Sequence, residues 1–301
     1  MWDLAKRSIA AWSDDYASSM GAALAYYTLF SLAPLLLLVI ALAGAVYGSE
    51  AARGAVVAQF GGLIGQEGSV AIQGLLKSAS QPAQSLIASL IGIVMLIVGA
   101  TSIFAELQSD LDRIWKAPAA KRPAGIAGLL RTRVLSFGLI VSIGFLLLVS
   151  LVVSAALAAF SEWYGGWFPG WMVTLEIVNQ VVSLAFVTAL FALMYRILPS
   201  VHVAWTDVWR GALATAVLFT IGKYLIGLYI GKAGIASGFG AAGSIVVLLV
   251  WVFYSAQIFL LGAEFTWLYA QSRGSRAEGS IHARALDLDE RRLPDPGPSH
   301  A

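Results

Sequence analysis

Six long apolar runs, separated by polar segments, set the pattern of this chain. They cover residues 22–47, 84–105, 134–160, 174–197, 209–230 and 242–268. A helix needs about 20 apolar residues to cross the hydrocarbon core of a bilayer, so each run is long enough for one crossing. Backbone N–H and C=O groups inside lipid must be paired within their own segment, so the runs are expected to be α-helices. The pattern predicts an all-α, polytopic membrane helix bundle with about six transmembrane helices.

The residues before the first run predict a shorter, amphipathic helix. Trp2, Ala5, Ile9, Trp12 and Tyr16 recur every three or four residues and therefore share one face, whereas the charged residues fall largely elsewhere. Such a helix either lies in the membrane interface or packs against the inner end of the bundle. Lys and Arg before an apolar run are also typical of a cleaved signal peptide. Because the apolar core of a signal peptide has only about 7–15 residues, the first run is interpreted as a transmembrane helix.

Polar segments elsewhere predict the rest of the organisation. Residues 48–82 form an outer loop with short amphipathic helices, and the second run continues inward as a helix until Ala117-Pro118 stops it. The glycine-rich segment 231–243 predicts a tight or re-entrant outer turn. The first and fifth runs begin with similar Gly- and Ala-rich segments, so a parallel internal repeat stays an open alternative. The polar residues that follow the last run divide the chain into a transmembrane domain, 1–270, and a disordered cytoplasmic tail, 271–301.

The distribution of Lys and Arg predicts the orientation of the bundle. With the N-terminus in the cytoplasm, 15 of the 19 Lys and Arg residues fall in inner segments and three in outer segments, while Lys223 lies within a run. Cytoplasmic loops of membrane proteins carry this excess of positive charge. The outer turn at 161–173 has three Trp and no Lys or Arg, which is typical of an interfacial aromatic belt. Both termini are therefore expected on the cytoplasmic side.

Composition narrows the classes of function. Hydrophobic residues make up 59% of the chain and charged residues 12%, which excludes an ordinary soluble domain. The chain has no cysteine and three widely separated histidines, and it contains no phosphate-binding loop or hydrolase motif. We therefore expect no catalytic residue, no cofactor and no metal ion. The basic inner loop at 113–133 fits membrane topology or anionic lipid better than nucleic acid.

Charged residues inside the runs are the candidate functional residues, because a charge at the centre of a membrane helix costs at least about 2.5–3.5 kcal/mol. Glu176, Lys223 and Glu264 meet this condition. Lys223 can extend outward and Glu176 lies near the outer start of its run, so water can reach both. Glu264 lies about 13 Å inside the expected inner edge, at 1.5 Å per helical residue. It belongs either to a transport path or to a buried ion pair, for which Arg196 has the most suitable depth and Arg210 the next.

Pro34 interrupts the first run near its middle. Proline removes a backbone donor and clashes with the carbonyl four residues earlier, so a helix kink is expected there. The kink either exposes carbonyls to a substrate path or is a packing feature satisfied by Thr28 or Ser31.

Several motifs resemble the YihY/BrkB family of bacterial inner-membrane proteins. The resemblance extends over about residues 15–270 and is clearest in Phe-Gly-Ala-Ala-Gly-Ser at 239–244, which continues into the last apolar run. The segments that carry it are 24–34, 111–115, 198–199, 205–207, 211–212, 239–244, 249–257 and 262–264. Phe239 replaces a tyrosine expected in the family, and Asp112 stands where the family often has an amide. Roles that need those groups are therefore not carried over.

The resemblance implies a six-helix protein of the bacterial inner membrane, usually without an assigned substrate. Some members carry the label ribonuclease BN, but the apolar composition of this chain argues against a ribonuclease. Others are called virulence or serum-resistance factors, which describes a phenotype and not a chemical activity. We interpret the chain as a transporter or flippase of a small or lipid-like solute, with Glu264 and Lys223 on its path. A non-transporting envelope-integrity or scaffold protein is the alternative, and a ribonuclease is third. Membrane lipids are the expected partners and nucleic acid is not, while the substrate and a homo-oligomeric state stay open.

Overall fold

The computed structural model describes residues 2–48, parts of 50–76, and residues 102–118, 171–233 and 243–276. Over these ranges the chain is helical and contains no strand. The helices are α1 (Trp2–Asp14), α2 (Ala17–Tyr47), α6 (Trp171–Ile197), α7 (Trp205–Ala233) and α9 (Gly243–Ser272). A further helix covers residues 102–114. The predicted all-α fold class is confirmed for this part of the chain.

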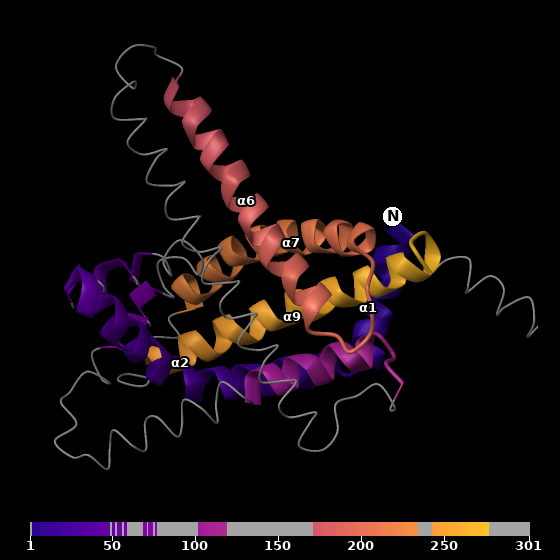
Figure 1. Cartoon of the computed structure of the whole chain (residues 1–301), viewed down its shortest axis with the longest axis horizontal. Coiled ribbons are helices and arrows are strands. Elements are labelled where there is room, and N and C mark those ends of the chain that lie inside the picture. The colour runs from indigo at the N-terminus through magenta and orange to yellow at the C-terminus, as the bar shows by residue number, and fades with distance from the viewer. Residues whose placement is uncertain are drawn as a thin grey trace, which may run out of the picture.

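Helix α9 is central to the arrangement (Figure 1). It packs against α7, α2 and α1, and α7 packs in addition against α6. Helix α1 lies beside the C-terminal end of α9, so that the beginning of the chain and the end of its last described helix share one end of the bundle (Figure 1). We call this the α1 end. It comprises α1, the first turns of α2, residues 107–118 and the C-terminal half of α9.

Three helices in the described part of the chain have the length and composition of membrane spans. They are Ile177–Ile197, Trp205–Ile230 and Ile245–Ser272, and they correspond to the fourth, fifth and sixth apolar runs. The first run lies within α2, which continues through Pro34 as one helix. The third run, most of the second run, the glycine-rich turn and nearly all of the polar tail lie outside the described residues. The count of six spans therefore stays a prediction.

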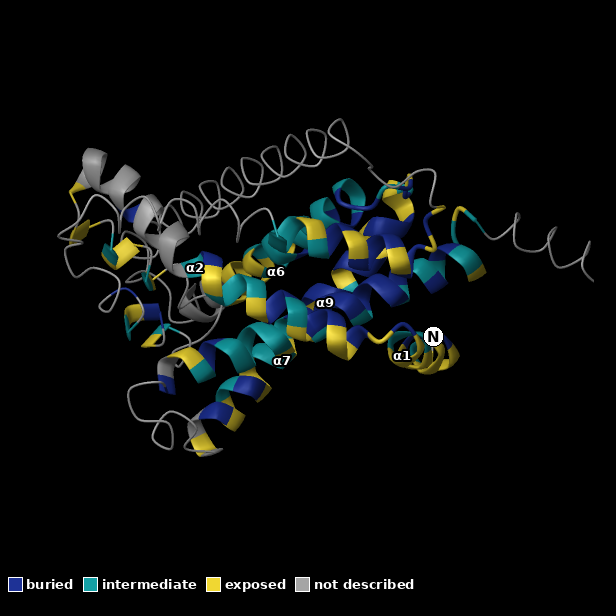
Figure 2. Cartoon of the chain, turned by 90° about the horizontal axis from the view of Figure 1, so that it is seen from below, coloured by how far each residue is buried: buried dark blue, intermediate teal, exposed yellow. Residues whose placement is uncertain are grey.

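Helix α7 carries a line of apolar side chains that stay about half exposed among the described residues. Leu213, Val217, Ile221, Leu225 and Leu228 are 41–62% exposed and follow one another every three or four residues. Figure 2 shows buried and exposed residues alternating along this helix. An apolar face of this kind, on a helix long enough to cross a bilayer, is what a membrane protein presents to lipid.

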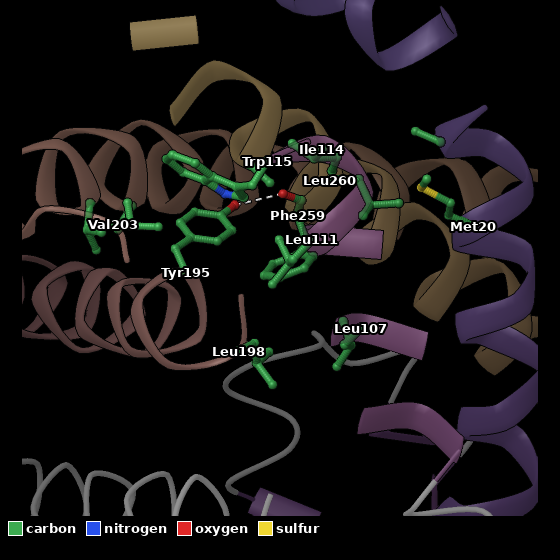
Figure 3. Close-up of a cluster of buried hydrophobic side chains, with 14 of the residues drawn as sticks. Met20, Leu107, Leu111, Ile114, Trp115, Tyr195, Leu198, Val203, Phe259 and Leu260 are labelled. Atoms are coloured by element: carbon green, nitrogen blue, oxygen red, sulfur yellow. Dashed lines mark hydrogen bonds between the residues drawn. The ribbon is translucent and has the colours of Figure 1, made fainter. Parts of the chain in front are cut away.

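The largest buried cluster lies at the α1 end, where residues of α2, the 102–114 helix, α6, α7 and α9 meet. Figure 3 shows Trp115, Tyr195, Leu111 and Leu260 within it. The Tyr195 hydroxyl donates to the carbonyl oxygen of Phe259 at 2.7 Å, and the two rings stack with centroids 5.1 Å apart. The cluster therefore fixes α6 against α9 by a polar as well as an apolar contact.

Glycines let two neighbouring helices approach α9 closely. A Cβ atom added at Gly21 of α2 would collide with Gln257 of α9, and one added at Gly211 of α7 would collide with Thr266 of α9. Small residues at helix contacts are a common way of packing membrane helices, since lipid offers no hydrophobic driving force between them.

Helix α1 has a packed face and an exposed face. Leu4 and Ser8 are buried and Trp12 packs against the large cluster, whereas Trp2 and Ile9 are exposed. The apolar stripe predicted from the sequence is therefore divided between the two faces. The contacts between α1 and α9 show that α1 packs on the end of the bundle, which is one of the two predicted alternatives. Contact with the membrane interface stays a prediction for the exposed face.

Candidate functional site

Glu264 lies in α9 at the α1 end and is completely buried, with 0% of its surface exposed. Neither of its carboxyl oxygens has a hydrogen-bond donor among the described residues. Leu260, one turn earlier in the helix, is also fully buried. Removing a carboxyl group from water costs free energy, and no described donor compensates for that cost here. Such a residue inside a membrane helix is by default a functional candidate.

An ion pair between a lysine and an aspartate lies beside Glu264. The Nζ of Lys116 donates to both carboxyl oxygens of Asp15, at 2.7 and 2.6 Å. The same Nζ lies 5.7 Å from the ring centre of Trp267, three residues after Glu264 in α9. Asp15 and Lys116, with Asp14, are the charged groups that act electrostatically on Glu264, and the carboxyl group of Asp15 is close enough to share a hydrogen bond with Glu264 when one of the two is protonated. We call Asp15, Lys116 and Glu264 the charged triad.

The charged triad runs from solvent to the interior. The side chain of Lys116 is 52% exposed, that of Asp15 is 13% exposed, and Glu264 is fully buried. The lysine therefore remains in contact with water while its ammonium group reaches a carboxylate that is mostly shielded. The three side chains therefore form a chain of charged groups that leads from the buried carboxyl of Glu264 to water at the α1 end.

Both partners of the ion pair lie at helix ends with a left-handed backbone. Lys116, with φ 49°, follows the 102–114 helix, and Tyr16, with φ 59°, follows Asp15 between α1 and α2. The N–H of Ala117 donates to the carbonyl of Asp112 at 2.8 Å, which is the helix-ending bond that usually accompanies a glycine. A left-handed conformation costs a residue other than glycine about 1–2 kcal/mol. Backbone strain of this kind concentrates at functional sites.

Lys116→Gly is expected to be more stable than Lys116→Ala by about 1 kcal/mol, because both substitutions remove the ammonium group and only glycine removes the backbone strain. Thermal unfolding of the purified protein in detergent checks this, with an expected difference of about 2–4 °C in the midpoint. Equal midpoints would show that the backbone at Lys116 is not strained.

Two other carboxylates, Asp112 at the α1 end and Asp207 in α7, accept hydrogen bonds that hold separate segments together. Asp112 accepts hydrogen bonds from the backbone N–H and the hydroxyl of Ser200, at 2.6 and 2.7 Å, which fastens the 102–114 helix to the turn after α6. Asp207, at the start of α7, accepts from the N–H and hydroxyl of Ser275, at 3.1 and 2.6 Å. The hydrogen-bonding role of Asp112 is thus settled by its contact with Ser200. Both carboxylates connect segments far apart in sequence.

Asp110 is a buried carboxyl of the 102–114 helix, outside the candidate spans. It is 3% exposed, and its Oδ2 atom has no donor among the described residues. Burial, and then the charge of Glu106, raise the pKa of Asp110 to about 7, although Arg113 acts in the opposite direction. The folded protein therefore binds a proton at Asp110 more tightly than the unfolded chain, whose value is 3.8. Stability is expected to fall as the pH rises from about 4 to about 7.

Asp110→Asn is expected to remove this part of the pH dependence. The asparagine protein should unfold a few degrees higher than the unsubstituted protein at about pH 8, where Asp110 carries a buried charge, and at nearly the same temperature at about pH 4. Thermal unfolding across this pH range checks the expectation. Parallel pH profiles of the two proteins would contradict it.

The structure does not place the predicted cations beside Glu264. Arg196 lies with its Nη1 atom 3.0 Å from the Nε2 atom of His202, in the turn between α6 and α7. Arg210 donates to the hydroxyl of a tyrosine in α9. Lys116 takes the position near Glu264 that depth along the helices suggested for Arg196. The reason is that depth measures position along a helix and carries no information on which face a neighbouring segment meets.

The other predicted site residues lie elsewhere in the bundle. Lys223 is half-buried on α7, with its ammonium group 5.4 Å from the ring centre of Tyr224. Glu176 and Pro34 belong to α6 and α2, and their side chains lie outside what the structure describes. Thr28 donates to a carbonyl one turn earlier at 2.7 Å, as serine and threonine often do within membrane helices.

No group of His, Asp and Glu side chains that could hold a metal ion occurs in the described part of the chain. The arrangement can instead bind and release a proton, because a carboxyl without a hydrogen-bond donor among the described residues lies next to a half-exposed cation and a second carboxylate. Helices of membrane length around a buried carboxyl define the class: an integral membrane protein with an ionisable group inside its helix bundle.

The particular family follows from comparison with known sequences. The sequence profile of the family described as Virulence factor BrkB matches residues 8–287, and the chain belongs to this family. The resemblance noted in the sequence is confirmed by this match.

Relatives with curated sequences are named as membrane proteins. A UPF0761 membrane protein of Pseudomonas paraeruginosa is 29% identical over 265 residues, which comprise 86% of this chain and 61% of the relative. A UPF0761 membrane protein of Pseudoalteromonas translucida is 30% identical over 254 residues, which comprise 84% of this chain and 81% of the relative. The chain thus spans about three fifths of the length of the Pseudomonas relative. No solved structure matches it.

Proposed function

We propose that this protein is a transport protein of the bacterial inner membrane in which Glu264 takes up and releases a proton while a small or lipid-like solute crosses. One observation carries the proposal: a fully buried carboxyl without hydrogen-bond donors among the described residues lies inside a candidate span, next to an ion pair that reaches water. A carboxyl kept only for helix packing would be expected to have donors around it.

The ion pair offers the buried carboxyl two arrangements. When Glu264 is neutral, the ammonium group of Lys116 stays on Asp15, as observed. When Glu264 is ionised, the same ammonium group is attracted by two carboxylates and shifts toward the interior. Each shift acts on the left-handed turns at Tyr16 and Lys116 and so on the angle between α1 and α2. Protonation is thereby coupled to the position of helices at the α1 end.

The α1 end faces the cytoplasm in this proposal, with both termini on that side and the helices crossing the membrane several times. Support comes from the charges, since Lys6, Arg7, Arg113 and Lys116 lie at this end and the last group of inner Lys and Arg residues begins at Arg273. No catalytic step is part of the proposed function.

Purified protein in vesicles that contain a pH-sensitive dye provides the test. With a proton gradient imposed, a panel of small anions, cations and neutral solutes and a fluorescent phospholipid are added in turn. At least one of them is expected to change the rate at which the gradient collapses, in vesicles with protein and not in empty vesicles. A folded protein that leaves the gradient unchanged with every solute would favour the non-transporting scaffold protein.

A further inference from the structure

We propose that helix α1 lies in the membrane interface at the α1 end, with one stripe of its side chains against phospholipid and a second stripe in water. The partner is the surface of the bilayer, at the level of the phosphates and the first carbons of the acyl chains. None of the residues of the charged triad takes part, so this contact stands apart from the proposed transport function.

The exposed part of α1 divides into two stripes. Residues that follow one another every three or four positions share one side of a helix. The first stripe, which we call the Trp2 stripe, consists of Trp2, Lys6, Ile9 and Ser13, all of them exposed. The second, the Asp3 stripe, consists of Asp3, Arg7, Ala10 and Asp14, which are exposed as well. The remaining side of the helix carries Leu4 and Ser8, which are buried.

The Trp2 stripe has the composition of a surface that meets head groups. Trp2 is 75% exposed and Ile9 is 57% exposed, so two large apolar side chains of a short helix have little of the described protein around them. The ammonium group of Lys6 lies 5.3 Å from the centre of the Trp2 ring. Tryptophan is enriched at the level of the head groups, and lysine extends its ammonium group to the phosphates while its stem stays on apolar surface. The pair therefore enters the interface together and keeps the contact between cation and ring.

The Asp3 stripe determines which side of α1 faces water. It carries the carboxylates of Asp3 and Asp14 and the guanidinium group of Arg7. Charged groups are costly to remove from water, so this stripe stays outside the lipid. Since the third side of the helix is packed on the bundle, one orientation about the helix axis places the apolar side chains in lipid and these charges in water.

The direction of α1 fits a position in the plane of the membrane. Figure 2 views α1 along its axis, whereas α7 and α9 run across the view. Helix α1 therefore crosses these two candidate spans at one end of the bundle (Figures 1 and 2). Amphipathic helices of the interface lie in its plane in the same way, with the apolar side toward the acyl chains.

Two exposed tryptophans mark the level of the interface at the same end. Trp205 and Trp209 begin the candidate span of α7, are 46% and 48% exposed, and have ring centres 6.4 Å apart. Hydrogen bonds from Ser275 to Asp207 fasten the start of α7 to the residues just after α9, and α1 packs beside that end of α9. Exposed tryptophans at the end of a membrane helix are typical of the head-group level. Helix α1 thus lies close to the level at which phospholipid head groups begin.

Single cysteines that carry a nitroxide label provide the test, because the chain has no cysteine of its own. The labels are placed at Ile9 and Ser13 on the Trp2 stripe, and at Asp3 and Ala10 on the Asp3 stripe as equally exposed controls. The full chain is reconstituted into vesicles of phosphatidylethanolamine and phosphatidylglycerol. Electron paramagnetic resonance measures the collisions of each label with oxygen and with a water-soluble nickel chelate. Labels at Ile9 and Ser13 are expected about 5–10 Å within the boundary between head groups and chains, and the other two in water.

Substitutions connect the depth of the label to the chemistry of the stripe. In the Ile9→Cys protein, Trp2→Ser is expected to shift the label toward water by several ångströms, because it removes the other large apolar side chain of the stripe. Lys6→Glu should act in the same direction, since it places a carboxylate at the level of the phosphates. Asp3→Asn, on the other stripe, is the matched control and should leave the depth unchanged. Glu264→Gln should also leave it unchanged, which separates this proposal from the transport proposal.

Two results with folded protein would overturn the inference. One is an equal rate of collision with the nickel chelate for labels at Ile9 and Ala10, which would place both stripes in water. The other is a label at Ile9 that neither oxygen nor the chelate reaches, which would show that protein, from the same chain or from a second copy, covers the Trp2 stripe.

Discussion

Glu264→Gln is expected to abolish proton-linked transport while the protein remains folded. The amide has the shape of the carboxyl but cannot exchange a proton, so the ammonium group of Lys116 stays on Asp15 in every state. Neither carboxyl oxygen of Glu264 has a donor among the described residues, and the amide of glutamine can donate to the neighbouring carboxylate of Asp15 as a protonated carboxyl does, so the substitution keeps the described contacts. The free energy of unfolding should therefore change by less than about 1 kcal/mol.

The structural alternative for Glu264 predicts a different result. If the carboxyl were one partner of a required buried ion pair, its removal would leave a cation unpaired and cost about 3–5 kcal/mol. Glu50→Gln, at an exposed helical position, is the matched control for removal of a carboxylate. For both variants, transport is measured with the protein in vesicles and thermal unfolding is measured in detergent. Normal transport by the Glu264→Gln protein would contradict the proposed function, whatever its stability.

Gly262→Ala is expected to destabilise the protein by about 1–3 kcal/mol, although it adds a single carbon atom. A Cβ at Gly262 would collide with the hydroxyl groups of Thr215 and Tyr195. These two hydroxyls lie 3.1 Å apart, and the Tyr195 hydroxyl also donates to the carbonyl of Phe259. The added carbon therefore forces α6 and α7 away from α9 and breaks buried hydrogen bonds, which costs more than the helix propensity gained by alanine.

Gly227→Ala provides the matched control for this substitution. A Cβ at Gly227, which lies in α7, meets none of the described residues within 4 Å. Alanine there should raise stability by up to about 1 kcal/mol through helix propensity alone. Unfolding midpoints of the two variants should therefore move in opposite directions. A Gly262→Ala midpoint equal to or above that of Gly227→Ala would contradict the tight contact of the three helices.

Hydrophobic patterning predicted the helices better than their contacts. The runs at 174–197 and 209–230 lie within α6 and α7, and residues 243–268 of the last run lie within α9, because a segment that must satisfy its own backbone in lipid has one regular solution. The amphipathic stripe of α1 predicted a helix correctly, but not which of its residues pack on the bundle. Both faces of α1 carry small or apolar residues, so the sequence does not distinguish them.

The charged triad could be predicted only in part. Glu264 stands out because a carboxylate inside an apolar run is rare. Asp15 and Lys116 lie 101 residues apart and outside the runs, where charges are ordinary, so no local pattern connects them. The left-handed backbone at Lys116 likewise cannot be predicted from the sequence, because Ala117-Pro118 after it indicates only that the helix ends there. Tertiary contact, and not spacing, brings these residues to one place.

Infrared difference spectroscopy of the protein in lipid tests proton exchange at Glu264 most directly, because it needs no knowledge of the solute. Spectra are recorded as the pH is changed between about 5 and 9, and the Asp110→Asn protein serves as the background so that Asp110, whose pKa of about 7 falls in this range, does not contribute. We predict a carboxyl band that changes with pH in this background and is absent when Glu264→Gln is added. Identical difference spectra with and without Glu264→Gln would show that Glu264 does not exchange a proton, and would contradict the proposed function.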